Sequence, residues 1–130
     1  MGNNSSSQID NNINIITYNT KLDFFSTYKC NKLVNYLSNL TKKKSIICLQ
    51  GINNNKSMSY ILDNLKEFFE KEHIIPSNNL IFISSFKIHN NEFKLFTNHN
   101  IINNKNGILM TDIKINDSLI TLYNTEFTEN

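Results

Sequence analysis

Residues 45–51 read Ser-Ile-Ile-Cys-Leu-Gln-Gly, a short apolar run bounded by the lysines at 42–44 and the asparagines at 53–55. The apolar residues of this run are consecutive, so neither face of a strand built from them would be polar. Such a run is typical of a strand that is buried on both faces of a sheet. We therefore predict a central strand over residues 45–50, with Cys48 as a small core residue.

The segments around this run have the periodicities of two helices and of further strands. Apolar residues at helical spacing predict helices over residues 30–43 and 57–72, with Ser57 as the second N-cap and Pro76 beyond its end. Strands are predicted over residues 13–18, 80–86, 92–97, 107–114 and 119–127. The order of these elements predicts an α/β (α+β) fold, with a mixed β-sheet flanked by two helices.

Length and composition indicate one globular domain without a strongly charged surface. The chain has 130 residues, of which 39% are hydrophobic, and its formal net charge is +2. This length suits a single core, and the small charge does not by itself indicate a nucleic-acid partner. Two cysteines with no visible disulfide framework fit a reducing compartment. Neither a signal peptide nor an apolar run of transmembrane length is present.

Residues 1–12 form a polar tail before the first predicted strand, and residues 13–130 form the predicted domain. The tail opens with Met-Gly-Asn-Asn-Ser-Ser, which matches the N-myristoylation pattern: Gly2 becomes the first residue after Met removal and Ser6 stands at the required position. One acyl chain binds membranes reversibly, so a second signal is expected, and the lysines at 42–44 are its candidate. The same lysines also suit a helix C-terminus. We expect the chain in the cytoplasm, at the cytoplasmic face of a membrane, or in a virion.

Four short segments occur in an order and at a spacing that match one known family. They are Tyr18-Asn19, the Ile-Ile-Cys-Leu-Gln run at 46–50, Asn106-Gly107-Ile108-Leu109 and Leu122-Tyr123-Asn124-Thr125. Together they resemble the first half of the endonuclease/exonuclease/phosphatase family of metal-dependent, DNase I-like phosphodiesterases. The resemblance covers most of residues 13–127. It implies half of a four-layer sandwich, in which two sheets are each flanked by helices.

The same resemblance implies one retained site residue and two replaced ones. Asn19 matches the family asparagine whose amide helps to hold the metal and the phosphate. The metal-ligating glutamate of the family corresponds to Gly51, which has no donor atom, and the active-site histidine corresponds to Glu126. The later family motifs, Gly-Asp-x-Asn and Ser-Asp-His, do not occur in this sequence. An amide cannot replace the missing carboxylates and imidazoles, so we predict no catalytic residue and no cofactor.

The remaining titratable residues do not form a second site in the sequence. The histidines lack the spacing of metal ligands; they are His73, His89 and His99. The carboxylates of the second predicted helix are expected on its solvated side; they are Glu67, Glu70 and Glu72. Asp23 follows the first strand and is a candidate for the wall of the family's cleft.

The favoured function is a non-catalytic, truncated phosphodiesterase-like protein with a structural or interaction role, tethered to a membrane and, in a virus, part of the virion. Half of the sandwich would leave one apolar sheet face uncovered. We therefore expect a homodimer or a subunit of a larger protein assembly.

Two alternatives remain open at this stage. One is a phosphodiesterase or nuclease that uses Mg²⁺ and is completed by a second chain, which supplies the missing groups. The other is a nucleic-acid-binding module, in which lysines and phenylalanines form the contact surface. Its residues are Lys87, Lys94, Lys105, Phe86, Phe93 and Phe96. Core packing is the preferred explanation for these phenylalanines, so a nucleic-acid partner is not expected.

Overall fold

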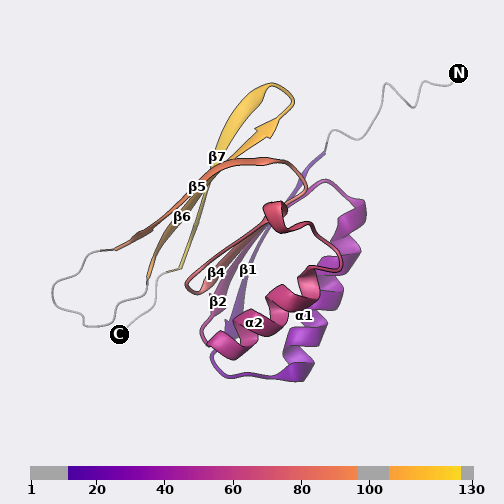
Figure 1. Ribbon diagram of the computed structural model, residues 1–130, viewed down its shortest axis with the longest axis vertical. Helices are drawn as coiled ribbons and strands as arrows, with labels where there is room; N and C mark the ends of the chain where they lie inside the picture. The colour runs from indigo at the N-terminus through magenta and orange to yellow at the C-terminus, as the bar shows by residue number, and fades with distance from the viewer. Residues whose placement is uncertain (1–11, 97–105, 127–130) are drawn as a thin grey trace, which may run out of the picture.

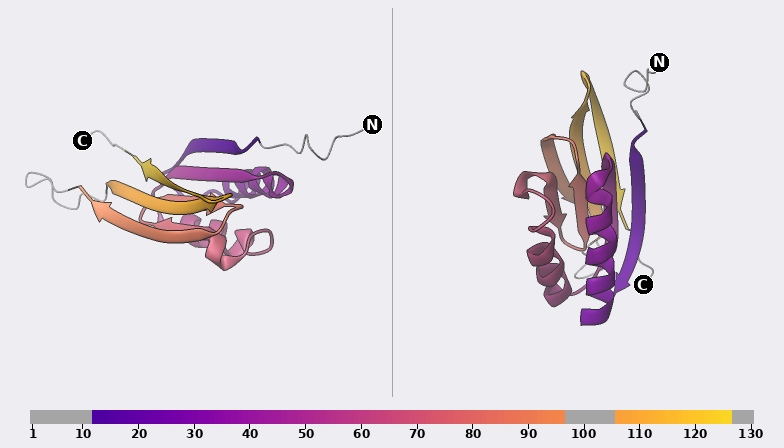
Figure 2. Two further views of the ribbon diagram at one scale, coloured as in Figure 1. Left: turned by 90° about the horizontal axis from the view of Figure 1, so that it is seen from above. Right: turned by 90° about the vertical axis from the view of Figure 1, so that its right-hand side faces the viewer.

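Two β-sheets and one layer of helices make up residues 12–96 and 106–126, the part of the chain that the computed structural model describes (Figure 1). The first sheet has the spatial order β1 (Asn14–Leu22), β2 (Ser45–Ile52), β4 (Leu80–Ser84), β3 (Ile74–Ser77). The second sheet has the order β5 (Ile88–Leu95), β6 (Gly107–Ile115), β7 (Ser118–Thr125). Helices α1 (Thr27–Asn39) and α2 (Asn55–Leu65) cover one face of the first sheet, and the second sheet packs on the other (Figure 2). The predicted mixed α/β fold is confirmed, with two sheets rather than one.

Strand β2 is the centre of the molecule, as its apolar run predicts. All eight of its residues are buried, and it pairs with β1 in parallel and with β4 in antiparallel register. Its side chains alternate between two cores: Ile47 and Leu49 pack with the helices, whereas Ile46 and Cys48 pack with the second sheet. Burial also raises the pKa of the Cys48 thiol to about 11.

Helix α1 covers the first sheet with the predicted stripe of apolar residues. It begins at Thr27 rather than at residue 30, because the Ser26 hydroxyl oxygen accepts a hydrogen bond from the Lys29 N–H at 3.2 Å. Its residues Leu33, Val34 and Leu37 are buried. The 3₁₀ turn η1 (Leu40–Lys42) follows, and the lysines at 42–44 are exposed there.

The prediction of the second helix is wrong at both ends. Asn54, not Ser57, is the N-cap, since its side-chain oxygen accepts the Ser57 N–H at 2.8 Å. The helix ends at Leu65, and the chain continues through η2 (Lys71–His73) into β3. Pro76 lies in this edge strand, where a missing N–H is tolerated. Neither described helix is long and apolar enough to cross a membrane.

The outer face of the second sheet has no covering helix among the described residues (Figure 2). Its side chains are the ones that alternate with the buried Leu109, Thr111 and Ile113 of β6. Polar members of this face are Asn90, Glu92, Lys94, Asp112, Lys114 and Thr121. Leu119 and Tyr123 are its exposed apolar members. The face is therefore mixed rather than wholly apolar, because charged and amide side chains lie among the apolar ones and keep it compatible with water.

Candidate functional site

The three positions that the family resemblance singles out meet at the C-terminal end of β2. Asn19 of β1 pairs with Gln50 of β2, and Gly51 follows directly. The Gly51 N–H donates to Oε2 of Glu126 at 3.0 Å. Asn19, Gly51 and Glu126 thus lie together although they are far apart in the sequence. With Gln50, Asn79 and Asn124 they form what we call the β2-end cluster.

Gly51 occupies a place where a side chain has no room. Its φ of +78° lies in the left-handed region, which costs other L-residues roughly 1–2 kcal/mol. A β-carbon at this position would lie 2.2 Å from Oδ1 of Asn19 and 2.9 Å from the backbone nitrogen of Lys21. Both distances are shorter than van der Waals contact. Asn19 and the backbone of Lys21 therefore fill the space that a side chain at position 51 would need.

Asn19 is exposed, but its oxygen already has a partner. Oδ1 accepts the N–H of Lys21 at 3.0 Å, and Lys21 has a φ of +51°. The register between β1 and β2 shifts between Asn19 and Leu22, which marks a β-bulge. The amide oxygen of Asn19 therefore stabilises this bulge.

Glu126 interacts with neutral hydrogen-bond donors. Its Oε2 accepts the Gly51 N–H and also the side-chain amide of Asn79, at 2.5 Å. Among the residues that the structure describes, the one ion pair joins Lys66 to Asp63, so no described cation pairs with Glu126. The carboxylate therefore connects the end of β7 to β2 through hydrogen bonds.

Two buried amides continue the cluster between the sheets. Gln50 donates from Nε2 to Oδ1 of Asn124 at 2.9 Å and to the Thr17 hydroxyl at 2.8 Å. Asn124, only 2% exposed, donates to the carbonyl oxygens of Leu49 and Ile81. The sequence contained both amides within its family-like segments, but their role as links between the sheets was not predicted. A polar residue inside a buried strand run was the available signal.

The β2-end cluster does not fit Mg²⁺, the metal that the fold implies. This ion prefers octahedral oxygen ligands and usually takes one or two carboxylates with substrate phosphate. Gly51 has no ligand atom, and Oδ1 of Asn19 accepts a hydrogen bond from the backbone N–H of Lys21. Glu126 is the one carboxylate of the cluster, and its Oε2 accepts two hydrogen bonds. Nowhere in residues 12–96 and 106–126 do three His, Cys, Asp or Glu side chains lie close enough to share a metal.

The other sequence candidates lie outside the cluster. His73 interacts through Nδ1 with the Ser84 carbonyl at 2.8 Å, and Asp23 accepts a hydrogen bond from Asn53 at 2.7 Å. His89 is exposed. The three carboxylates predicted on the second helix are also exposed but lie beyond its end at Leu65; they are Glu67, Glu70 and Glu72. Phe86 and Phe93 pack against the core between the sheets, as preferred. Gly2, His99 and Lys105 lie outside the described residues.

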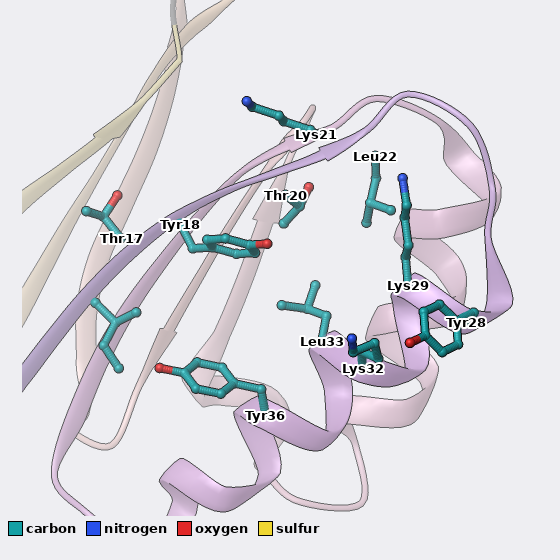
Figure 3. Close-up of a pocket in the computed structure, with 11 residues that line it drawn as sticks. Thr17, Tyr18, Thr20, Lys21, Leu22, Tyr28, Lys29, Lys32, Leu33 and Tyr36 are labelled. Carbon is teal, nitrogen blue, oxygen red and sulfur yellow. The ribbon is translucent and has the colours of Figure 1, made fainter.

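A second candidate site, which the sequence did not reveal, lies between β1 and α1 (Figure 3). This β1–α1 groove has a volume of about 680 Å³. Its lysines are Lys21, Lys29 and Lys32, its tyrosines are Tyr18, Tyr28 and Tyr36, and no acidic residue lines it. Tyr28, Lys32 and Tyr36 follow one another at helical i, i+4 spacing on α1. That spacing was visible in the sequence, and the strand was predicted over residues 13–18, but the position of the strand beside this face of the helix was not predicted.

Two solved structures share the fold of this chain. The structure of a β-hairpin deletion mutant of beta toxin from Staphylococcus aureus covers 89% of this chain, with a TM-score of 0.61 and 11% identity. The crystal structure of truncated Caenorhabditis elegans TDP2 covers 88%, with a TM-score of 0.60 and 16% identity. Both have endonuclease/exonuclease/phosphatase folds, so the resemblance is supported at the level of the fold. This chain spans 51% and 46% of those two proteins. No protein-family model and no curated protein matches the chain.

Proposed function

We propose that this domain is a non-catalytic form of the phosphodiesterase fold with a structural or interaction role. The observation that carries the proposal is the Gly51 position. Asn19 and the backbone of Lys21 fill the space that a ligating side chain would need there. Replacing Gly51 by Glu would therefore not be enough to create a metal ligand. The neighbouring atoms and the positive φ of this position both oppose any side chain there.

The chemistry of phosphodiester cleavage supports this reading. Phosphate ester hydrolysis is extremely slow without catalysis, and metal-dependent enzymes supply a charge clamp together with an oriented nucleophile. The polar groups of the β2-end cluster instead bond to one another and to the backbone. Their role is to hold β1, β2 and β7 in register at the junction of the two sheets.

An assay of the purified chain tests the lack of catalysis. The substrates are bis(p-nitrophenyl) phosphate and double-stranded DNA, each with Mg²⁺ or Mn²⁺. Asn19→Ala and Glu126→Ala are the controls, since a contaminating nuclease is indifferent to both. We expect the same background rate for all three proteins. A metal-dependent rate that falls in either variant would show that the chain cleaves phosphodiesters and would refute the proposal.

The proposed role includes attachment to a membrane through Gly2. It also includes participation in a protein assembly, which would be the virion if the chain comes from a virus. The acylation pattern at residues 1–6 motivates the attachment. Intact mass measurement of the native N-terminus tests it: a myristoyl group on Gly2 is expected, and retained Met1 or an unmodified Gly2 contradicts the tether. Gly2→Ala should then release the protein from the membrane fraction.

A further inference from the structure

We propose that the β1–α1 groove binds an extended acidic segment of a partner protein, which adds to the sheet as a strand beside β1. This inference rests on the proposed interaction role and specifies the chemistry of the partner. It combines two features of the described residues: an open strand edge and a basic, aromatic groove next to it.

The open edge belongs to β1. This strand has nine residues and stands at the end of its sheet, where β2 is its one partner among the described strands (Figure 1). In a parallel pair, alternate backbone groups of an edge strand point away from the neighbour and are free to pair with a further chain. Ile15 is 66% exposed on this strand. Strand addition at such an edge is a recurrent mode of peptide recognition.

The other sheet edges suit an added strand less well. β3 has four residues and contains Pro76, which cannot donate a backbone hydrogen bond. β5 carries Glu92 as well as Lys94, so its charges do not favour a partner of one sign. β7 is long but carries no charged residue that would select a partner. β1 alone among these edges has lysines along the groove beside it.

Charge determines the type of partner. Lys21, Lys29 and Lys32 line the groove without an acidic neighbour among its lining residues, and none of them belongs to an ion pair between described residues. Lys32 stands 5.0 Å above the ring of Tyr28. Figure 3 shows Lys29 and Tyr36 of α1 extending toward β1, and Lys32 lying beside Tyr28. Carboxylates on the incoming strand would be attracted by these lysines and would accept hydrogen bonds from them and from the tyrosine hydroxyls.

The spacing of the lysines predicts the pattern of the partner. Lys29 and Lys32 are one helical turn apart, which is about 5 Å along the axis. Every second side chain of a strand points to the same face, and such neighbours are about 7 Å apart. An acidic–x–acidic pattern on the added strand therefore matches the two lysines, while the intervening residues face away from α1.

Two other occupants fit the edge and the groove less well than an acidic peptide. A second copy of this chain, paired through its own β1, would bring the same lysines to the junction, and like charges repel. Single-stranded nucleic acid is acidic and can stack on tyrosines, but it does not use the backbone edge of β1. An acidic peptide is the ligand that uses the edge, the lysines and the tyrosines together.

The test uses a capped peptide of alternating Glu and Val, with the nine residues that match β1. Binding to the full chain is followed by amide chemical shifts and by fluorescence anisotropy. The same peptide with Lys for Glu and an oligothymidine are compared with it. So are two forms of the acidic peptide in which alternate backbone nitrogens are methylated, one form for each edge of the strand. N-methylation on the correct edge removes the strand pairing and leaves the charges unchanged.

Two protein variants locate the binding. Lys29→Glu with Lys32→Glu reverses the charge of the groove, and Lys42→Glu with Lys43→Glu is the matched control at exposed lysines outside it. We expect saturable binding of the acidic peptide with shifts in β1 and α1. The groove variant should bind about tenfold more weakly, and the control variant within about twofold of the parent. The Lys peptide and at least one N-methylated peptide should also lose about tenfold.

The proposal is overturned by any of three results: no saturable binding of the acidic peptide, equal weakening in the two lysine variants, or tighter binding of oligothymidine than of the peptide. These failures leave the proposed lack of catalysis intact. A metal-dependent phosphodiesterase rate would refute the proposed function, whatever the peptide does. The two failures are therefore separate.

Discussion

The β2-end cluster and the β1–α1 groove share strand β1 but use their polar residues in opposite ways. In the cluster, amides and a carboxylate form hydrogen bonds with each other and with the backbone. For example, Nε2 of Gln50 donates to Oδ1 of Asn124 at 2.9 Å. In the groove, Lys21 and Lys29 have no described acidic partner, and Tyr28 is 69% exposed. Polar residues that satisfy one another stabilise a fold, whereas unpaired charges on an open surface remain available for a ligand.

This contrast separates the place where the fold family suggests chemistry from the place where this chain can bind. The β2-end cluster has more hydrogen bonds between its own side chains than the groove has, and mutations there should affect stability. The groove should tolerate mutation with little loss of stability. The following substitutions test the contrast in order of decreasing effect on the free energy of unfolding.

Gly51→Glu introduces a carboxylate at the position that the family resemblance singles out and should be the most damaging change. The positive φ and the contacts of the β-carbon with Asn19 and Lys21 should together cost about 3 kcal/mol. Urea unfolding measures the loss. Gly51→Ala should show most of it, because the clash begins at the β-carbon. A Gly51→Glu protein as stable as the parent would mean that this position is not blocked.

Asn124→Ala should cost about 2 kcal/mol, because it removes a buried amide that accepts from Gln50 and donates to the carbonyls of Leu49 and Ile81. The matched control is Asn90→Ala on the exposed β5, which should stay within about 0.5 kcal/mol of the parent. Both values come from urea unfolding. Equal values for the two variants would remove the distinction between the bonded cluster and the open surface.

The buried thiol of Cys48 should make the free energy of unfolding depend on pH. Burial raises the pKa of its thiol from 9.0 to about 11, so the unfolded chain loses this proton first as the pH rises. The contribution of the protonated Cys48 thiol to the free energy of unfolding is fully present below pH 9 and is lost as the pH rises towards 11. At pH 10 the parent should have lost about 1 kcal/mol relative to Cys48→Ala, when each is compared with its own stability at pH 8. Parallel pH profiles for the two proteins would contradict this burial.

Lys29→Glu with Lys32→Glu should have the smallest effect on unfolding, less than about 1 kcal/mol. Both side chains are exposed, and among the described residues the double substitution removes one cation–π interaction, that of Lys32 with Tyr28. Thermal and urea unfolding are the measurements. A destabilisation as large as that of Asn124→Ala would show that the lysines are part of the structure, and the contrast with the cluster would fail.

The sequence predicted those parts of the fold that depend on local pattern. The apolar run predicted as a central strand over residues 45–50 is the buried β2. That the Tyr18-Asn19 and Leu122–Thr125 segments lie at its end was not predicted. The end of α2 was missed, because the helical spacing continues through Phe68 and Phe69 although tertiary pairing recruits the following residues into β3. Local propensity cannot register such competition from a distant strand.

The detailed roles of the site residues depended on tertiary structure. That Gly51 lacks a ligand atom was evident from the sequence, but the positive φ and the Asn19 oxygen in its space require coordinates. The groove was invisible because its lysines come from β1 and α1, and only the packing of these elements brings them together.

The central claim is that the β2-end cluster is structural and does not hold a metal. Titration with Mn²⁺, followed by paramagnetic broadening of backbone amide signals, tests it most directly. We predict that the amides of Asn19, Gly51 and Glu126 broaden no more than that of the exposed Glu67, and only when Mn²⁺ is in excess. Selective broadening of those three amides at less than one equivalent of Mn²⁺ would contradict the account.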